Sequence, residues 1–377
     1  MARWMRALHG GLQQWCADVG RTTVSMVAAA GAAGAAGAGG GRGVTVQRLR
    51  PRCPLVILSG ATPGPFYHSH PHVPSEFDHV DFDMASQLRA NLETIRKIGA
   101  NVGDHALPFA WPSAWGTAAE TAAAAAAAAG DAPPSPPPYL RNPLLLHWIS
   151  NTGAGFDANR SVIHDTQASV LAELGMDAPT VLGEFETGGN VSDRRFLLET
   201  FAAFGLEGAD GGEAGGEGGR EGGEGGEGGS VQLDIKAEFD ASVFMPYAAG
   251  YCVSGPRDLA LFRVTAASGE DTAPADGPAQ VERLLEKLGA VLGELGATYD
   301  DVVLAWERVA DLDADEEAVL MTRAAIGFDR PLANSVLELA ASDVNEPAPD
   351  GTPIAIEYIV AASVPRRDAD ADAGNEP

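Results

Sequence analysis

Basic residues and cysteines are scarce in this sequence of 377 residues. Lysine and arginine number 25 against 52 aspartates and glutamates, which gives a formal net charge of -27. Since phosphate binding needs basic side chains, this balance argues against nucleic acid as a partner. The three cysteines, Cys16, Cys53 and Cys252, have neither a paired nor a metal-like spacing. We therefore expect no disulfide framework, no zinc site and a reducing compartment.

Long runs of leucine, isoleucine and phenylalanine are missing as well. The longest apolar stretches consist of alanine and glycine, so a membrane span is not expected. The sequence also has no GxSxG elbow, no HExxH helix and no P-loop. Serine-hydrolase, metalloprotease and nucleotide-binding chemistry thus lack their signatures, and we expect no cofactor.

The N-terminal 53 residues carry seven arginines against the single acid Asp18. An arginine-rich, acid-poor start is typical of transit peptides for the mitochondrion or plastid. A disordered extension on a cytoplasmic protein has the same composition. Both interpretations exclude residues 1–53 from the predicted fold.

Low-complexity segments divide the remainder of the chain. Residues 105–139 contain an alanine run and a proline run, and residues 207–230 are rich in glycine and glutamate. Both compositions are typical of solvated insertions, and residues 364–377 resemble a disordered acidic tail. At about 150 residues per domain, the length allows two domains.

Three stretches share one order of signals: an apolar, strand-like run closed by Gly with Ser or Asn, and later a helix that begins near a glutamine. The strand-like runs are "PLVILSGATPG" (54–64), "NPLLLHWISNTGAG" (142–155) and "LALFRVTAASG" (259–269), and the glutamines are Gln87, Gln167 and Gln280. This recurrence predicts a fold that is used more than once.

The last copy is the clearest. After Gln280, apolar residues recur every three or four positions up to Leu295, which predicts a helix that lies on a sheet and stops at Gly296. A strand "DVVLAWERVADL", a helix "DEEAVLMTRAAIGF" and the strands "NSVLELAA" and "TPIAIEYIVAA" follow. This order predicts an α+β domain, a mixed sheet with two helices on one face.

These residues resemble the YjgF/RidA (Rid) family, historically called L-PSP endoribonucleases, whose fold is like that of trimeric chorismate mutase. The resemblance covers about residues 255–363 well, and residues 54–104 are similar to the first half of such a domain. Residues 142–205, ending in "SDRRFLLETFAAFG", which we interpret as helical, look like a diverged copy. The resemblance implies an N-terminal unit (54–250) and a C-terminal domain (251–363) that pack sheet to sheet.

The resemblance also implies a chemistry. Rid enzymes hydrolyse reactive imines and enamines to keto acids and ammonia in clefts between subunits, where an arginine holds the substrate carboxylate and an acid places the water. Asn334 in "PLANS" stands where the arginine is expected, and Arg330 is a candidate to supply the missing charge. In "IAIEYIVA" the first acid position is Ala355, so Glu357 is the candidate catalytic residue. Glu357 also fits a structural role as a satisfied strand acid.

A histidine-rich stretch, "YHSHPHVPSEFDH" (67–79), could present several imidazoles and Glu76 to a metal ion. Pro71 and Pro74 interrupt the alternation that such a site needs. A surface loop with no metal is the favoured interpretation.

Two classes of function remain open. One is a divergent Rid hydrolase with weak deaminase activity on small imines or enamines, and the other is a non-catalytic module that binds a metabolite or a protein. A chorismatase-like enzyme is a further alternative, because it has tandem Rid-like domains. The apolar strand faces predict self-association as a trimer or pseudo-trimer.

Overall fold

The computed structural model describes residues 24–29, 44–49, 54–58, 60–63, 81–100, 102, 143–179, 181–189, 196–206, 230–233, 250–255, 257–265, 277–310, 333–338 and 356–366. These residues form two six-stranded mixed sheets and three long helices. The first sheet has the order β5-β4-β6-β3-β8-β7 and the second has the order β11-β10-β12-β9-β2-β1.

The strands of the first sheet are β3 (Leu55–Leu58), β4 (Leu144–Ser150), β5 (Val181–Thr187), β6 (Leu198–Gly205), β7 (Ser230–Leu233) and β8 (Gly250–Val253). Those of the second are β1 (Val24–Ala29), β2 (Val44–Leu49), β9 (Arg257–Thr265), β10 (Val302–Val309), β11 (Ala333–Glu338) and β12 (Ile356–Pro365). The helices are α2 (Met84–Ala100), α4 (Phe156–Glu173) and α5 (Gly277–Glu294), with a short 3-10 turn η4 (Tyr299–Asp301).

The two sheets have the same pattern of strand directions. In each, one edge pair is parallel, β4 with β5 and β10 with β11, and all other pairs are antiparallel. The chain order within the first sheet, β3-α2-β4-α4-β5-β6, matches the order that the sequence predicts for the last copy. Part of the second unit's predicted order, the helix at 315–328, lies outside the described residues.

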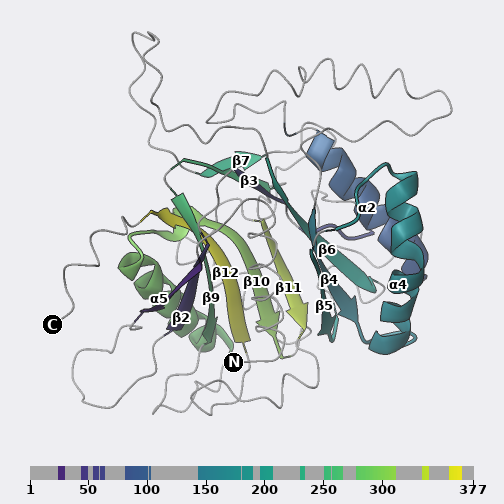
Figure 1. The fold of residues 1–377 in the computed structure, drawn as a ribbon. Helices are drawn as coiled ribbons and strands as arrows, with labels where there is room; N and C mark the ends of the chain where they lie inside the picture. The colour runs from purple at the N-terminus through teal and green to yellow at the C-terminus, as the bar shows by residue number, and fades with distance from the viewer. Residues whose placement is uncertain are drawn as a thin grey trace, which may run out of the picture.

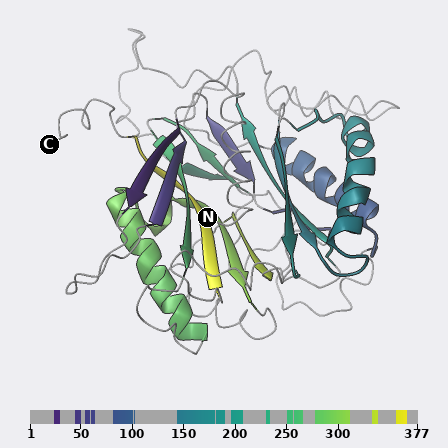
Figure 2. The same ribbon diagram turned by 60° about the horizontal axis from the view of Figure 1, so that its bottom comes forward.

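The molecule is layered as helix, sheet, sheet and helix (Figures 1 and 2). Helices α2 and α4 pack on the outer face of the first sheet, and α5 packs on the outer face of the second. The inner faces meet in a shared apolar core, to which β3, β4, β6 and β8 contribute from one side and β9, β10 and β12 from the other. The two sheets therefore pack face to face, as the sequence analysis expected. None of the described helices is long and apolar enough to cross a membrane.

Helix α5 follows from its sequence directly. Every apolar residue of the predicted stripe is buried: Val281, Leu284, Leu285, Leu288, Val291, Leu292 and Leu295. The helix ends at Glu294, and Gly296 has a φ of 71°, a left-handed conformation that glycine adopts without strain. The predicted helix and its stop are confirmed.

Residues 142–205 do not form a separate copy. Strand β4 pairs with β6, and β6 pairs with β3, so this stretch completes the sheet that begins at Leu55. The segment that we interpreted as helical contains strand β6, which is buried along its whole length. A short, continuously apolar run has no periodicity to separate helix from strand, and the sheet on both sides decides the outcome.

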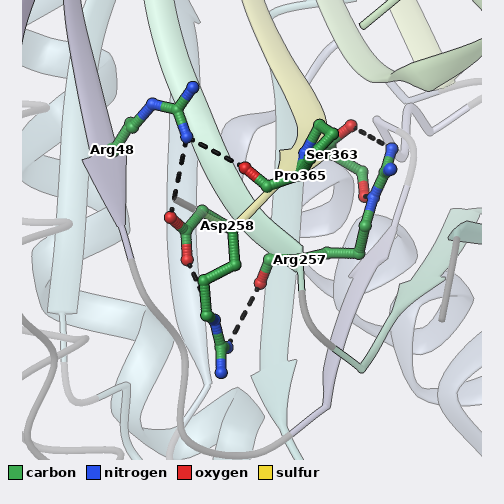
Figure 3. A network of polar contacts seen from close by, with 6 residues as sticks. Arg48, Arg257, Asp258, Ser363 and Pro365 are labelled. Atoms are coloured by element: carbon green, nitrogen blue, oxygen red, sulfur yellow. Dashed lines mark hydrogen bonds and ion pairs between the residues drawn. The ribbon is translucent and has the colours of Figure 1, made fainter. Parts of the chain in front are cut away.

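The N-terminal segment that the sequence analysis left out of the fold supplies β1 and β2. Val46 is buried in the core under α5, and β2 pairs with β9. Arg48 donates a hydrogen bond to the carbonyl oxygen of Pro365 at 3.0 Å and forms an ion pair with Asp258 at 3.8 Å (Figure 3). Beside this pair, Arg257 donates to the side chain and the carbonyl of Ser363. The contacts of Arg48 fasten β2 to β9 and β12, and those of Arg257 join β9 to β12.

Candidate functional site

The most unusual polar group in the described structure is a buried ion cluster on the inner face of the second sheet. The two oxygens of Glu357 are held separately, because Arg308 donates to Oε1 at 2.6 Å and Arg263 binds Oε2. The side chains of Arg308 and Glu357 are completely buried, and that of Arg263 is 10% exposed. Within this cluster two guanidinium groups share one carboxylate.

Strand geometry brings these residues together. Glu357 on β12 is the register partner of Arg308 on β10, so both side chains project from the same face. Arg263 on β9 pairs with Ile359, two positions from Glu357, which puts it diagonally next to the carboxylate. Ile359 belongs to the core between the sheets, so the cluster faces the first sheet.

The first sheet meets this cluster with an aromatic ring. The guanidinium carbon of Arg308 lies 5.3 Å from the centre of the Trp148 ring, a cation-π distance. Trp148 also contacts Phe185 and Trp306, with ring centres 5.0 and 5.9 Å apart. The buried charge is thus covered by an aromatic wall, which favours a guanidinium over a compact ammonium group.

Strand pairing shows that the two sheets carry equivalent positions here. Ala203 on β6 and Ala361 on β12 hold equivalent positions, because each pairs with an apolar residue on both neighbouring strands. An acid lies four residues before each alanine, Glu199 in β6 and Glu357 in β12. The register partner of Glu199 is Trp148, and that of Glu357 is Arg308. Both acids are buried. Trp148 and Arg308 therefore occupy the same position in two sheets and touch each other across the interface.

The equivalence ends where the register of the first sheet shifts. Ile57 pairs with Ala203 but Ala61 bridges Thr200, whereas in the second sheet Arg263 follows the regular register beside Ile359. A Cβ added at Gly60 would lie 2.0 Å from Oε1 of Glu199 and 2.7 Å from Phe201. The space that a side chain would need is already filled. The second sheet alone carries the pair of arginines.

Space near the cluster is limited. A cavity of about 40 Å³ lies between the sheets and is lined by apolar side chains, Trp306 among them. A larger, open groove of about 470 Å³ runs between α2 and α4 on the outside of the first sheet, where Arg89 and Glu173 form an exposed ion pair. Neither is lined by Glu357 or its arginines.

A second buried polar network lies on the outer face of the first sheet. Nε2 of His147 is 2.7 Å from Oε1 of Gln167, and Nδ1 is 2.9 Å from Oγ1 of Thr200. Since the amide oxygen only accepts, the geometry assigns the proton to Nε2 and makes Nδ1 the acceptor. Thr200 also accepts a hydrogen bond from Asn91. Burial lowers the pKa of His147 to about 4, so the imidazole is neutral.

Of the site residues proposed from the sequence, only Glu357 has a side chain that the structure describes. Glu357 is the carboxylate at the centre of the ion cluster. The backbone of Asn334 on β11 pairs with Ala305, three residues before Arg308 on β10. Arg330, Ala355 and the histidine-rich stretch 67–79 lie outside the described residues. Among the residues that the structure describes, no group of His, Cys, Asp or Glu is arranged to hold a metal ion.

Sequence reasoning missed the two arginines that hold Glu357. A signal was present, because Arg263 interrupts "LALFRVT" and Arg308 follows "VVLAWE", both otherwise apolar strands. A charge inside a buried strand needs a partner of opposite sign. Searching for that partner in neighbouring strands would have led to Glu357.

No protein-family model matches the sequence, and no curated protein matches it. Similar solved structures include a YjgF/YER057c/UK114 family protein from Mycobacterium tuberculosis, with 26% identity and a TM-score of 0.23, which covers 36% of this chain and 99% of that one. The YjgF gene product from E. coli has 22% identity and a TM-score of 0.24, covering 34% and 98% of the two chains. A conserved Rid-family protein of unknown function from Yersinia pestis has 19% identity and a TM-score of 0.24, covering 36% and 99%.

Proposed function

We propose that this chain is a divergent Rid-like protein that binds a small carboxylate-bearing metabolite and hydrolyses imines or enamines weakly or not at all. Two observations support the family. The Rid-like sequence pattern spans about residues 255–363. The first unit has the strand and helix order β3-α2-β4-α4-β5-β6 that this pattern predicts.

The arrangement of Glu357 carries the functional part of the proposal. An acid that activates water must be reached by that water. Glu357 is completely buried, and each of its oxygens is already bound to a guanidinium group. This geometry favours a structural anion over a working base, so the proposal puts binding before hydrolysis.

The same geometry suggests the class of ligand. Two guanidinium groups that converge on one carboxylate form a fork for a planar anion. Glu357 fills this fork from within. A small carboxylate that enters beside Arg263, the one partly exposed member, would compete with Glu357. Binding to the parent protein should therefore be weak.

Replacement of Glu357 tests this competition. In Glu357→Gln the arginines lose their internal anion, and we expect acetate and 2-oxobutanoate to bind at least ten times more tightly than to the parent, measured by calorimetry. The matched control is Glu307→Gln, which changes a buried acid on the other face of β10, the face whose residues Ala305 and Val309 belong to the core under α5. Unchanged affinity in a folded Glu357→Gln protein would refute the proposed site.

Arg263→Met gives a second test, because it removes the partly exposed arginine. When Arg263→Met is added to Glu357→Gln, the affinity for acetate and 2-oxobutanoate should fall at least tenfold. Circular dichroism of both variants verifies that they fold. Equal affinity with and without Arg263 would contradict a role in binding.

The deaminase alternative is tested by keto-acid release from enamines generated in the assay. The neutral Asn334 should limit turnover, since a lost charge-assisted contact costs about 2 to 3 kcal/mol, or roughly two decades in rate. Asn334→Arg should raise activity if Asn334 or Arg330 lies at a substrate carboxylate. Turnover typical of an ordinary Rid enzyme in the parent, abolished by Glu357→Gln, would favour the hydrolase.

The expected trimer or pseudo-trimer remains part of the proposal. The inner faces of both sheets are already covered within one chain, so any further association has to use strand edges or outer surfaces. Light scattering at micromolar concentration distinguishes a trimer from a monomer in which the two units alone satisfy the apolar faces.

A further inference from the structure

The two sheets are connected by one antiparallel strand pair that runs from the first into the second. On one side β3 pairs with β8, and on the other β2 pairs with β9. In each Cα pair of both stretches, from Val46 with Phe262 to Leu58 with Gly250, the two residue numbers add to 308. The register is therefore unchanged across the short connections between β2 and β3 and between β8 and β9. We call these paired strands, β2 and β3 with β8 and β9, the ribbon.

The ribbon exchanges strands between the two halves of the chain. Strands β1 and β2 precede β3 in the chain but complete the sheet of β9. Strands β7 and β8 precede β9 but complete the sheet of β3. Each sheet thus takes two of its six strands from the other half.

The exchange is symmetric. β3 and β9 hold equivalent places in their sheets, and so do β8 and β2. An antiparallel pair in which each strand plays the same role as its partner is the arrangement found at the two-fold axis of a dimer. The contact between Trp148 and Arg308, equivalent residues of the two sheets, fits the same approximate axis.

We propose that the chain is a fused dimer: its halves, residues 1–206 and 230–377, are complementary partners that recognise each other through the ribbon and the core between the sheets. The contacts between the described residues of the two halves then hold them together without a continuous chain. Each half binds the other half. Each has an open sheet edge that accepts two strands, and each supplies two strands to the open edge of its partner.

The forces at this interface suffice without a covalent link. Each half gives its partner a strand with main-chain hydrogen bonds, at the places where β2 pairs with β9 and β8 pairs with β3. The shared core between the sheets adds large apolar side chains, including Trp148, Phe201 and Trp306. An interface that combines strand pairing with an apolar core resembles the interior of a domain, which is typical of obligate dimers.

Scission of the folded chain tests the proposal. We would insert the recognition sequence of a site-specific protease between Gly219 and Arg220 and cut the full-length protein after folding. The two pieces should co-elute in gel filtration at the position of the uncut chain at micromolar concentration, and separate only in denaturant. Two separate peaks in native buffer would overturn the proposal.

A disulfide tests the ribbon itself. Cys252 on β8 is the register partner of Val56 on β3, and both side chains are buried in the same core. Opposite residues of antiparallel strands lie within the range that a disulfide can bridge. In a protein with Cys16→Ser and Cys53→Ser, Val56→Cys should therefore form a disulfide with Cys252 on oxidation.

The readout is a non-reducing gel after scission. The Val56→Cys protein should migrate as one band with the mass of the whole chain and yield two bands after reduction. The matched control is Ile57→Cys, whose register partner is Tyr251 and whose side chain lies in the core on the opposite face of the sheet. Two bands from oxidised Val56→Cys, or cross-linking of both variants alike, would refute the register on which the proposal rests.

Discussion

Arg308 lies against the ring of Trp148, and these two residues hold equivalent positions in the two sheets. In a true two-fold dimer, a residue on the axis meets its own copy. Here the equivalent positions hold an arginine in one sheet and a tryptophan in the other, so the contact is a cation-π pair. Each of the two residues has a buried acid as its strand partner, Glu357 beside Arg308 and Glu199 beside Trp148.

This arrangement predicts a large effect of removing the arginine. Arg308→Met leaves Glu357 buried with only Arg263, and breaking a buried pair on one side costs about 3 to 5 kcal/mol. Urea unfolding should show the loss as a lower midpoint. Replacing both partners, Arg308→Met with Glu357→Leu, should cost less than the single change. Arg89→Met, in the exposed pair with Glu173, serves as the control and should alter the midpoint little.

Gly60 should tolerate no side chain. Gly60→Ala places a methyl group against Glu199 and Phe201, and crowding of this kind costs about 1 to 3 kcal/mol. Gly293→Ala is the comparison, because nothing lies within 4 Å of a Cβ there. In helix α5 that change should stabilise the protein by about 0.5 to 1 kcal/mol. Equal effects in thermal unfolding would show that the space beside Glu199 is not constrained.

His147 predicts a pH dependence of stability. Burial lowers its pKa from 6.5 to about 4 in the folded protein, so between these values the unfolded chain binds more protons. The stabilisation is complete above pH 6.5 and is lost as the pH falls towards 4, by about 3 kcal/mol in total. His147→Gln cannot titrate. The difference in unfolding free energy between parent and variant should therefore shift in favour of the variant from pH 7 to pH 4, and a constant difference would contradict the assignment.

Two truncations should show which part of the N-terminal segment contributes to stability. Removing residues 1–53 deletes β2 and with it the contacts of Arg48 to Asp258 and Pro365. This exposes the edge of β9 and should lower the melting temperature by at least several degrees. Removing residues 1–43 retains β2 and should cost less. Equal melting temperatures of the two truncated proteins would mean that β2 adds nothing to the second sheet.

The spacing of apolar residues predicted those elements that have one buried face and one exposed face. Helix α5 has one buried stripe, and its pattern of leucines and valines was sufficient to place it. Strand β6 is buried on both faces, so its sequence reads equally well as helix. Strand β2 lies in an arginine-rich context, and the one charge that matters, Arg48, has its partner Asp258 far along the chain. Such pairings are set by tertiary structure and leave no local pattern.

For a similar reason, only part of the candidate site could be predicted from the sequence. Glu357 was identified because it lies in a motif-like strand, whereas Arg263 and Arg308 lie on two other strands that no spacing rule connects to it. Trp148 comes from the other sheet. A site that is formed by four strands from two sheets can be recognised only when the register of each strand is known.

The unchanged register of the ribbon has a consequence for synthesis of the chain. Strand β3 cannot gain its β8 neighbour, nor β2 its β9 neighbour, until about residue 265 has been made, since the partners lie some two hundred residues apart. The first unit must therefore wait on the ribosome with an open edge, and the second sheet stays incomplete until β12, which lies between β9 and β10, has also been made. Contacts so distant in sequence slow folding and make the transition cooperative across the units. A nascent chain that is released early would carry an unpaired strand edge, the feature on which aggregation most readily begins.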